Sequence, residues 1–194
     1  MKKPLFEMTL EELWQLFPIV LSEHKACWAG WYNNEKARIT DFLQIPEARI
    51  SHIGSTAVRN IWAKPIVDIM VEIPETISPK TAQKLITENG YILMSESERR
   101  KSFNRGYTPE GFAERVFHLH LRHFGDNNEL YFCDYLIDNP HIAKEYEALK
   151  LSLWQKYEHN RNAYTDAKTD FIEKHTTQAK IRYKNRYAQL KAGN

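Results

Sequence analysis

The segment 65–73 constrains the fold most, because it combines an apolar run with two acidic side chains. It reads Pro-Ile-Val-Asp-Ile-Met-Val-Glu-Ile, and an apolar, β-branched run of this length is typical of a buried strand. Side chains alternate between the two faces of a strand, so Asp68, Met70 and Glu72 share one face, opposite the aliphatic residues. The sequence therefore predicts a strand that carries two carboxylates on one face.

A glycine-serine turn precedes this strand. Residues 49–53 predict a short strand that runs into Gly54-Ser55-Thr56. Glycine allows a sharp turn and a close approach of phosphate to the backbone amides, and the two hydroxyl groups add donors. Since Mg²⁺ takes few protein carboxylates together with phosphate oxygens, the turn with Asp68 and Glu72 predicts a site for a divalent cation and a nucleoside triphosphate. The alternative is an ordinary turn with two surface acids.

A further strand is predicted over 115–122, with its histidines on one face and its apolar side chains on the other. A neutral imidazole serves as a metal ligand or general base near pH 7, and arginine pairs with phosphate. We therefore expect His118 and Arg115 to contact phosphate and His120 to act in catalysis. A His-x-His pair also chelates a transition metal where an acid supplies a third ligand through the fold. The alternative is a solvated polar face.

Other cations are candidates for completing an anion site. They are Lys64, Arg105, Lys150 and Lys168. Taken singly, each is typical of a protein surface. Lys64 has the stronger case as a phosphate ligand, because it directly precedes a proline and therefore lies in extended chain. Lys168 shares a helix face with Tyr164 at i, i+4, which suits either a base-and-phosphate contact or a packed ring under a lysine stem.

Several of these motifs occur in one known family. The sequence resembles the signature of the GrpB family in segments 52–58, 63–72, 103–106, 118–121, 134–136, 146–150 and 164–172. The resemblance spans roughly residues 10 to 180, and the family belongs to the nucleotidyltransferase-fold superfamily. It implies a mixed sheet in which a Gly-Ser turn binds nucleotide phosphates and an acid pair on the next strand holds the metal.

The chain departs from this superfamily pattern at the second acid. Asp68 matches the first acid, whereas Met70 stands where the second is expected, and a thioether is a poor ligand for a hard cation. Glu72 lies on the same face, two residues further along. We therefore expect one Mg²⁺ at Asp68 and Glu72 rather than a two-metal site. The expected function is nucleotidyl transfer to an unidentified acceptor. The alternative is a non-catalytic protein that binds a nucleotide or another phosphorylated small molecule on the same scaffold.

The order of predicted elements gives an α+β domain with a mixed or mostly antiparallel sheet, flanking helices and a helical carboxyl-terminal part. One or two helices fill 9–43, the strands at 49–53 and 65–73 flank the turn, and a helix runs from Ser78-Pro79 to Asn89-Gly90. The later expected elements are a strand at 91–94, a charged connection at 96–104, a strand at 115–122, a helix from about 140 past 153, and a helix from about 164.

Composition bounds the class and the partners of the chain. Its 194 residues, 27% charged and 42% hydrophobic, are typical of one globular domain. We expect that domain to fill 1–194 around a core at about 10–180. The net charge of +2 calls for neither nucleic acid nor an acidic membrane. An amphipathic stretch, 9–29, argues against a signal peptide. We therefore expect a cytoplasmic protein with no membrane partner and with Cys27 and Cys133 reduced.

The segment 174–194 is the best argument for nucleic acid as a partner. It carries basic side chains with two tyrosines among them: Lys174, Lys180, Arg182, Tyr183, Lys184, Arg186, Tyr187 and Lys191. A basic helix with interleaved tyrosines can track a phosphate backbone and stack on bases. A solvated last helix whose cations favour its carboxyl end needs no partner, and we take this second interpretation as the default.

Overall fold

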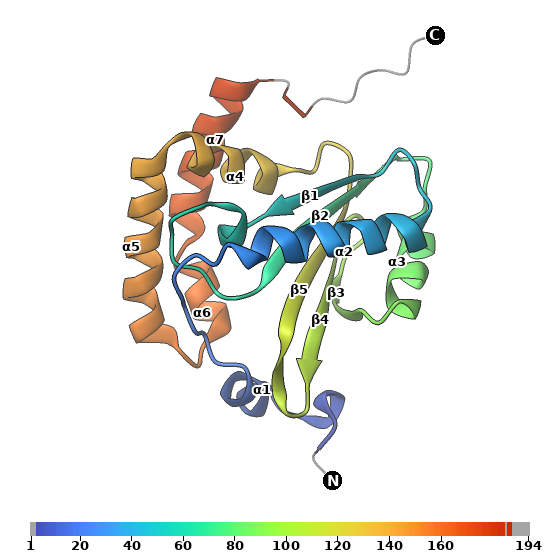
Figure 1. Cartoon of the computed structure of the whole chain (residues 1–194), viewed down its shortest axis with the longest axis horizontal. Helices are drawn as coiled ribbons and strands as arrows, with labels where there is room; N and C mark the ends of the chain where they lie inside the picture. Colours follow the sequence, from blue (N-terminus) through green and yellow to red (C-terminus); the bar gives the residue numbers. More distant parts are fainter. Residues whose placement is uncertain (1–2, 185, 188–194) are drawn as a thin grey trace.

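A five-stranded mixed sheet forms the centre of the computed structural model, which describes residues 3–184, 186 and 187 (Figure 1). The strands are β1 (Arg49–Ile53), β2 (Val67–Ile73), β3 (Ile92–Glu96), β4 (Lys101–Thr108) and β5 (Gly111–His123). They lie in the order β1-β2-β5-β4-β3. β2 and β5 are parallel and the other neighbouring pairs are antiparallel. The predicted α+β class with a mixed sheet is therefore confirmed.

Helices cover the sheet and extend beyond it. They are α1 (Leu10–Leu16), α2 (Cys27–Leu43), α3 (Pro79–Glu88), α4 (Asn128–Asp138), α5 (Pro140–Tyr157), α6 (Arg161–Asp166) and α7 (Thr169–Tyr183), with short 3₁₀ turns at Leu5–Glu7 and Ser55–Ala57. In Figure 1, α2 crosses the sheet, whereas α4, α5, α6 and α7 gather on the left of the view. Within the described residues, none of these helices combines the length and the hydropathy needed to cross a bilayer.

β2 is buried on both faces, which explains its near-continuous apolar sequence. Its aliphatic face packs with residues of α2 and α3 in the main core, among them Trp28 and Ile86. On the opposite face, the wholly buried Met70 packs with Ile53 of β1 and Leu130 of α4. The expected alternation is confirmed, and Met70 is a core residue rather than a side chain facing a ligand.

Helix boundaries follow local capping chemistry. A reciprocal capping box between Thr9 and Glu12 begins α1, and Ser78 caps α3 ahead of its first-turn proline. α1 ends before Pro18, and residues 17–26 separate it from α2. The region 9–43 therefore holds two helices with a break at the proline, as proline in a helix interior would require.

Two elements differ from the predicted order. β4 begins at Lys101, inside the segment expected to be a charged connection, and pairs along its length with β5. Its sequence, Lys-Ser-Phe-Asn-Arg-Gly-Tyr-Thr, lacks a regular apolar alternation, and its backbone pairs with β3 as well as with β5. α4 is absent from the predicted order, and it packs on the β1–β2 side of the sheet and against α7.

The described part of the basic segment packs against α4. Arg186 pairs with Asp134 at 2.5 Å, and the Tyr183 hydroxyl donates to Asp138 at 2.6 Å. Lys191 lies outside the described residues. Two of the side chains considered for nucleic-acid contact are thus held by acids of the protein itself.

Candidate functional site

The glycine-serine turn lies against the first acid of β2. Gly54 has a φ of 69°, and the antiparallel register places the last residue of β1 opposite Asp68. A Cβ at position 54 would lie 2.4 Å from Asp68 Oδ2. Only glycine therefore satisfies both the backbone conformation and the close approach. The structure brings the turn and Asp68 together, as the sequence predicts.

Two imidazoles of β5 approach the other oxygen of the same carboxylate. His118 Nδ1 lies 3.3 Å and His120 Nε2 lies 3.7 Å from Asp68 Oδ1. Burial raises the pKa of Asp68, but hydrogen bonding and charge from the two histidines outweigh burial and hold this pKa well below its usual range. Asp68 is therefore a carboxylate at neutral pH, with Oδ2 directed toward the turn.

His118 is itself oriented by a chain of contacts that reaches α6. Arg161 Nη1 donates to the Tyr107 hydroxyl at 2.8 Å, and this hydroxyl lies 2.8 Å from His118 Nε2. Arginine can only donate, so the Tyr107 hydroxyl accepts from Arg161 and donates its own proton to His118 Nε2. The ring proton of His118 is therefore assigned to Nδ1, the nitrogen that faces Asp68. Burial lowers the pKa of His118, so the ring is neutral near pH 7. Both of its nitrogens are thus engaged within the protein.

Three lysines converge on the turn from distant parts of the chain. Lys64 comes from the loop before β2, Lys150 from α5, and Lys168 from the N-cap of α7. Lys150 Nζ donates to Ser55 Oγ at 3.0 Å. Lys168 Nζ lies 4.2 Å from the centre of the Tyr164 ring, and Lys64 Nζ lies 5.5 Å from it. Lys150 and Lys168 are buried, which is rare for lysine and corrects their interpretation as surface residues.

Burial lowers the pKa of all three lysines, and neighbouring cations lower it further for Lys64 and Lys150. The pKa is about 7 for Lys64, about 7 for Lys150 and about 8 for Lys168. Of the described residues that line the cavity between them, Asp68 is the one acid. A bound anion would favour the protonated form of each lysine. The electrostatics of this cavity therefore favour an anionic ligand.

The cavity enclosed by these groups has a volume of about 190 Å³. Its walls include Gly54, Ser55, Thr56, Lys64, Asp68, His118, Lys150, Tyr164 and Lys168. The Tyr164 side chain is 1% exposed, and its hydroxyl has no hydrogen-bond partner in the described structure. A buried hydroxyl without a partner costs free energy, so a ligand that accepts a hydrogen bond would be stabilised here.

A wider cleft of about 670 Å³ adjoins this cavity. The two spaces share Gly54, Ser55, Asp68 and Tyr146 as wall residues. His120 lines only the cleft, and His118 lines only the cavity. Asp68 therefore lines two neighbouring spaces whose other wall residues differ.

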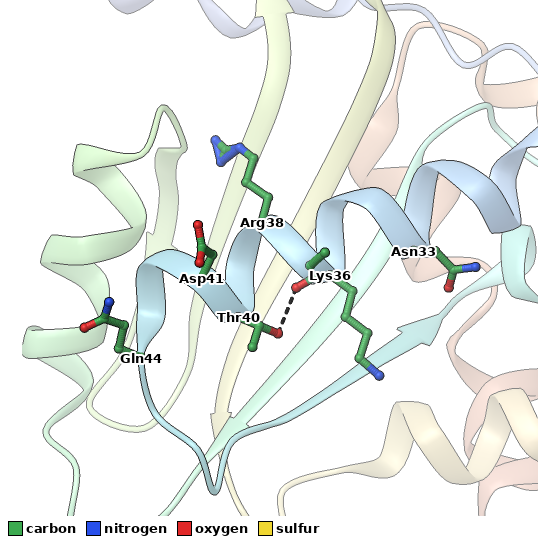
Figure 2. A pocket seen from close by; sticks show the side chains of 7 residues that line it. Asn33, Lys36, Arg38, Thr40, Asp41 and Gln44 are labelled. Atoms are coloured by element: carbon green, nitrogen blue, oxygen red, sulfur yellow. Dashed lines mark hydrogen bonds between the residues drawn. The ribbon is translucent and has the colours of Figure 1, made fainter.

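The outer surface of α2 carries a hollow of another kind, with a volume of about 840 Å³ (Figure 2). Its lining comes from α2 and the residue that follows the helix. Figure 2 shows these side chains pointing away from the helix in different directions, with the Thr40 hydroxyl bonded to the Lys36 carbonyl at 2.9 Å. Because no groups converge on it from other elements, this hollow is not a candidate site.

Comparison with known proteins now adds to this geometry. A family model described as GrpB protein matches residues 18–178. The chain belongs to the GrpB family. It is 32% identical over 158 residues to UPF0157 protein YqkA of Bacillus subtilis, a match that covers 80% of this chain and 45% of YqkA. It is 30% identical over 164 residues to glutamate-rich protein GrpB of Alkalihalophilus pseudofirmus, covering 80% and 92% of the two chains. The chain thus spans less than half the length of YqkA.

Solved structures agree with the family and extend the fold comparison. The crystal structure of GrpB from Enterococcus faecalis superposes with a TM-score of 0.72 at 28% identity, covering 84% of this chain and 99% of that one. The Cid1 poly(U) polymerase, in a structure described as MgGTP bound, superposes with a TM-score of 0.50 at 7% identity, covering 76% and 47%. The second likeness shows the fold alone, and it confirms the expected nucleotidyltransferase-like scaffold for this GrpB protein.

Glu72, expected to share the metal with Asp68 and to act in catalysis, lies elsewhere in this GrpB protein. Its two carboxylate oxygens accept from Arg49 Nε at 2.5 Å and Nη2 at 2.7 Å, and Asn127 adds a third bond at 3.1 Å. The β1–β2 register causes this, because Arg49 lies directly opposite Glu72. Glu72 lines neither space at Asp68. The expected two-carboxylate site is therefore corrected to one carboxylate.

A single carboxylate is compatible with Mg²⁺, which commonly takes its other ligands from phosphate oxygens and water. Among the described residues, no group of three or more His, Cys, Asp or Glu side chains suits a metal ion. The donor set at Asp68 therefore fits a cation that arrives with a phosphate ligand, and does not fit a metal held by the protein alone.

Arg115, expected on phosphate, lies on the opposite side of the sheet. Its guanidinium carbon lies 5.8 Å from the centre of the Trp31 ring on α2. The alternation along β5 that directs His118 toward Asp68 turns Arg115 the other way. Arg105, another candidate cation, pairs with Glu35 of α2 at 2.5 Å. Neither arginine reaches the turn.

Sequence reasoning missed the roles of Tyr107 and Arg161 and undervalued Lys150. A signal for Lys150 was present, because it follows Tyr146 and Glu147 at helical spacing on the buried face of α5. Thr56, expected at the phosphates, is buried and its hydroxyl lies 2.9 Å from His52 Nε2. It lines the cavity and also holds the turn against β1.

Proposed function

We propose that this GrpB protein binds a nucleoside triphosphate, with its phosphates in the lysine cavity and one Mg²⁺ at Asp68. One observation carries the proposal: Lys64, Lys150 and Lys168 converge on the Gly-Ser turn, and Asp68 is the one acid among the described residues of the cavity wall. Three ammonium groups and one carboxylate leave about two positive charges, which match the roughly two negative charges of a triphosphate bound to Mg²⁺.

The fold comparison supports the ligand class. The Cid1 poly(U) polymerase is described with MgGTP bound, and this chain shares its scaffold. The turn that the scaffold carries here has a glycine in contact with the Asp68 carboxylate and a Ser55 hydroxyl in contact with Lys150. Both are suited to a phosphate chain with a metal ion beside it.

The residues around Asp68 also suit transfer of the nucleotidyl group. A bound Mg²⁺ would neutralise charge on the phosphate oxygens. An acceptor hydroxyl would form a bond to the α-phosphorus, the bond to pyrophosphate would break, and His120 would receive the hydroxyl proton. Lysines would hold the phosphates in place, and His118 would keep Asp68 oriented. Positioning and electrostatics supply most of the catalysis in such reactions.

A non-catalytic binding protein is the second candidate, and a specific observation favours it. Met70 is wholly buried between β1 and α4, and Glu72 is bound by Arg49. One carboxylate is then left where the superfamily pattern uses two acids. This alternative predicts the same ligand and the same binding residues, without release of pyrophosphate.

The test is the unfolding free energy of the full chain with ATP, GTP, CTP or UTP, each with and without Mg²⁺. At a hundred times its dissociation constant, a ligand raises this free energy by about 2.7 kcal/mol. We expect the Mg²⁺-dependent part to vanish in Asp68→Asn and to persist in Asp41→Asn, an exposed acid of α2. Absence of stabilisation by all four nucleotides would overturn the proposal. Pyrophosphate release with candidate acceptors then separates the transferase from the binding protein.

A further inference from the structure

The lysine cavity is too small for a whole nucleotide. Its volume of about 190 Å³ equals roughly six water molecules at about 30 Å³ each. Pockets that bury a small organic molecule measure roughly 300–1,000 Å³. The cavity therefore has room for phosphate groups, and the remainder of a nucleotide must lie outside it.

The cleft beside the cavity has the required size. Its volume is about 670 Å³, within the range of small-molecule pockets. Gly54, Ser55, Asp68 and Tyr146 form a wall common to both spaces. A ligand with phosphates among the lysines thus has the cleft beside it, next to Asp68.

The lining of the cleft differs from that of the cavity. Apolar side chains of α4 and α7 line one part of it, with Phe132, Leu136 and Ile172 among them. Four threonines line it as well: Thr165 at the end of α6 and Thr169, Thr176 and Thr177 on α7. Apolar surface suits a base, and hydroxyl groups suit the hydroxyls of a ribose.

The α7 contribution is a single helix face. Its cleft-lining residues are Thr169, Ile172, Glu173, Thr176, Thr177 and Lys180, which recur at helical spacing. Glu173 adds a carboxylate, and Glu129 of α4 adds a second. Arg100 and Lys180 add two cations, so the charges of these four side chains balance. The cleft therefore lacks the excess positive charge that the lysine cavity offers to phosphates.

We infer that the cleft between α4 and α7 binds the nucleoside of the same nucleotide whose phosphates occupy the lysine cavity. This inference rests on the proposed function. The ligand is then a nucleotide whose phosphates contact the lysines and whose nucleoside contacts α4 and α7. Asp68 would lie beside the bond between the phosphates and the sugar. If the acceptor occupies the cleft instead, nucleotides should bind no more tightly than inorganic tripolyphosphate, and this result would overturn the inference.

The experiment compares the dissociation constants of ATP, UTP and inorganic tripolyphosphate for the full chain in the presence of Mg²⁺. Tripolyphosphate carries no nucleoside, so its dissociation constant measures binding in the lysine cavity alone. The variant Thr169→Leu/Thr177→Leu fills the α7 face of the cleft with larger apolar side chains. We expect a nucleotide to bind the native chain about tenfold more tightly than tripolyphosphate, and this advantage to be lost in the variant with tripolyphosphate binding unchanged.

Thr40→Leu is the matched control. Thr40 and Thr177 are both exposed helical threonines whose hydroxyls donate to the carbonyl four residues before, so the two substitutions have similar effects on helix stability. Nucleotides that bind no more tightly than tripolyphosphate, or an advantage that survives in the double variant, would overturn the inference and leave the proposed phosphate site standing. Failure of the native chain to bind tripolyphosphate or nucleotides would overturn both.

Discussion

The two acids of β2 lie on one face of one strand and have opposite surroundings. Glu72 is wholly buried and both of its oxygens are bound by Arg49. The Asp68 side chain is 28% exposed, contacts two imidazoles, and lines the cavity of three lysines. Arg49 neutralises the charge of Glu72, whereas the side chains around Asp68 carry more positive than negative charge. Side-chain periodicity identifies the face of a carboxylate, and strand register determines its partner.

The contrast between Glu72 and Asp68 is tested most strongly by removing the charge of each acid in turn. Glu72→Gln breaks a buried ion pair, for which losses of about 3–5 kcal/mol are usual. We expect about 3 kcal/mol, because the Arg49 side chain is 30% exposed and water partly replaces its partner. Asp68→Asn should cost less than Glu72→Gln, since the Asp68 carboxylate is partly exposed and has no bidentate arginine partner. Urea unfolding measures both, and equal losses would show that the two acids do not differ in this way.

The contact between the turn and Asp68 is tested by Gly54→Ala with Gly90→Ala as its control. Both glycines have a positive φ, 69° and 83°, so each substitution adds about 1–2 kcal/mol of backbone strain. Alanine at 54 also meets Asp68 Oδ2, whereas nothing lies within 4 Å at position 90. We expect Gly54→Ala to lower the unfolding free energy more than Gly90→Ala does. Gly54→Ala should also abolish Mg²⁺-dependent nucleotide binding, which Gly90→Ala should retain. Indistinguishable variants would refute the contact.

The excess positive charge at the Asp68 end is tested by Lys168→Met. The substitution keeps the side-chain length and removes a buried ammonium group, so nucleotide affinity should fall about tenfold or more. The ligand-free protein should keep or gain stability, because burial of the charge is unfavourable. Lys174→Met removes an exposed lysine of the same helix and should change neither quantity by much. Titration calorimetry and urea unfolding provide the two readouts.

The pH dependence of the ligand-free protein tests the same positive charges without a bound ligand. The pKa values of Lys64, Lys150 and Lys168 fall to about 7, 7 and 8 in the folded chain, so the unfolded chain binds more protons above pH 7. The unfolding free energy should therefore rise from pH 7 to 8, below the pKa of about 8.5 at which thiols titrate in the unfolded chain. Lys168→Met should flatten the rise, and so should bound nucleotide. A falling free energy over this range would contradict the lowered pKa values.

Local pattern was enough to predict the turn and its strand. Glycine-serine chemistry and the apolar run located Gly54 and β2, and alternation placed Asp68 on the correct face. The partner of Glu72 depended on register, which the sequence does not state directly. β4 has no regular apolar alternation, and it is held by backbone pairing with β3 and β5, so side-chain periodicity did not reveal it.

The cationic half of the site was harder to predict for a different physical reason. Lys150 and Lys168 acquire their role only when α5 and α7 pack against the turn. These segments are almost a hundred residues apart in the sequence, so no local pattern indicates that they pack together. The buried face of α5 that carries Lys150 is the one exception. The link from Arg161 through Tyr107 to His118 likewise joins three elements that the sequence keeps separate.

The bond between Lys150 and Ser55 also has a consequence for how the protein responds to cleavage. Asp68 and the turn belong to the first half of the chain, and two of the three cavity lysines belong to the last third. A polyanion bound between them contacts both parts at once and should slow their separation. Saturating ligand should therefore protect the connection between α5 and α6 from limited proteolysis, and a cut there should release the ligand even though every binding residue is still present.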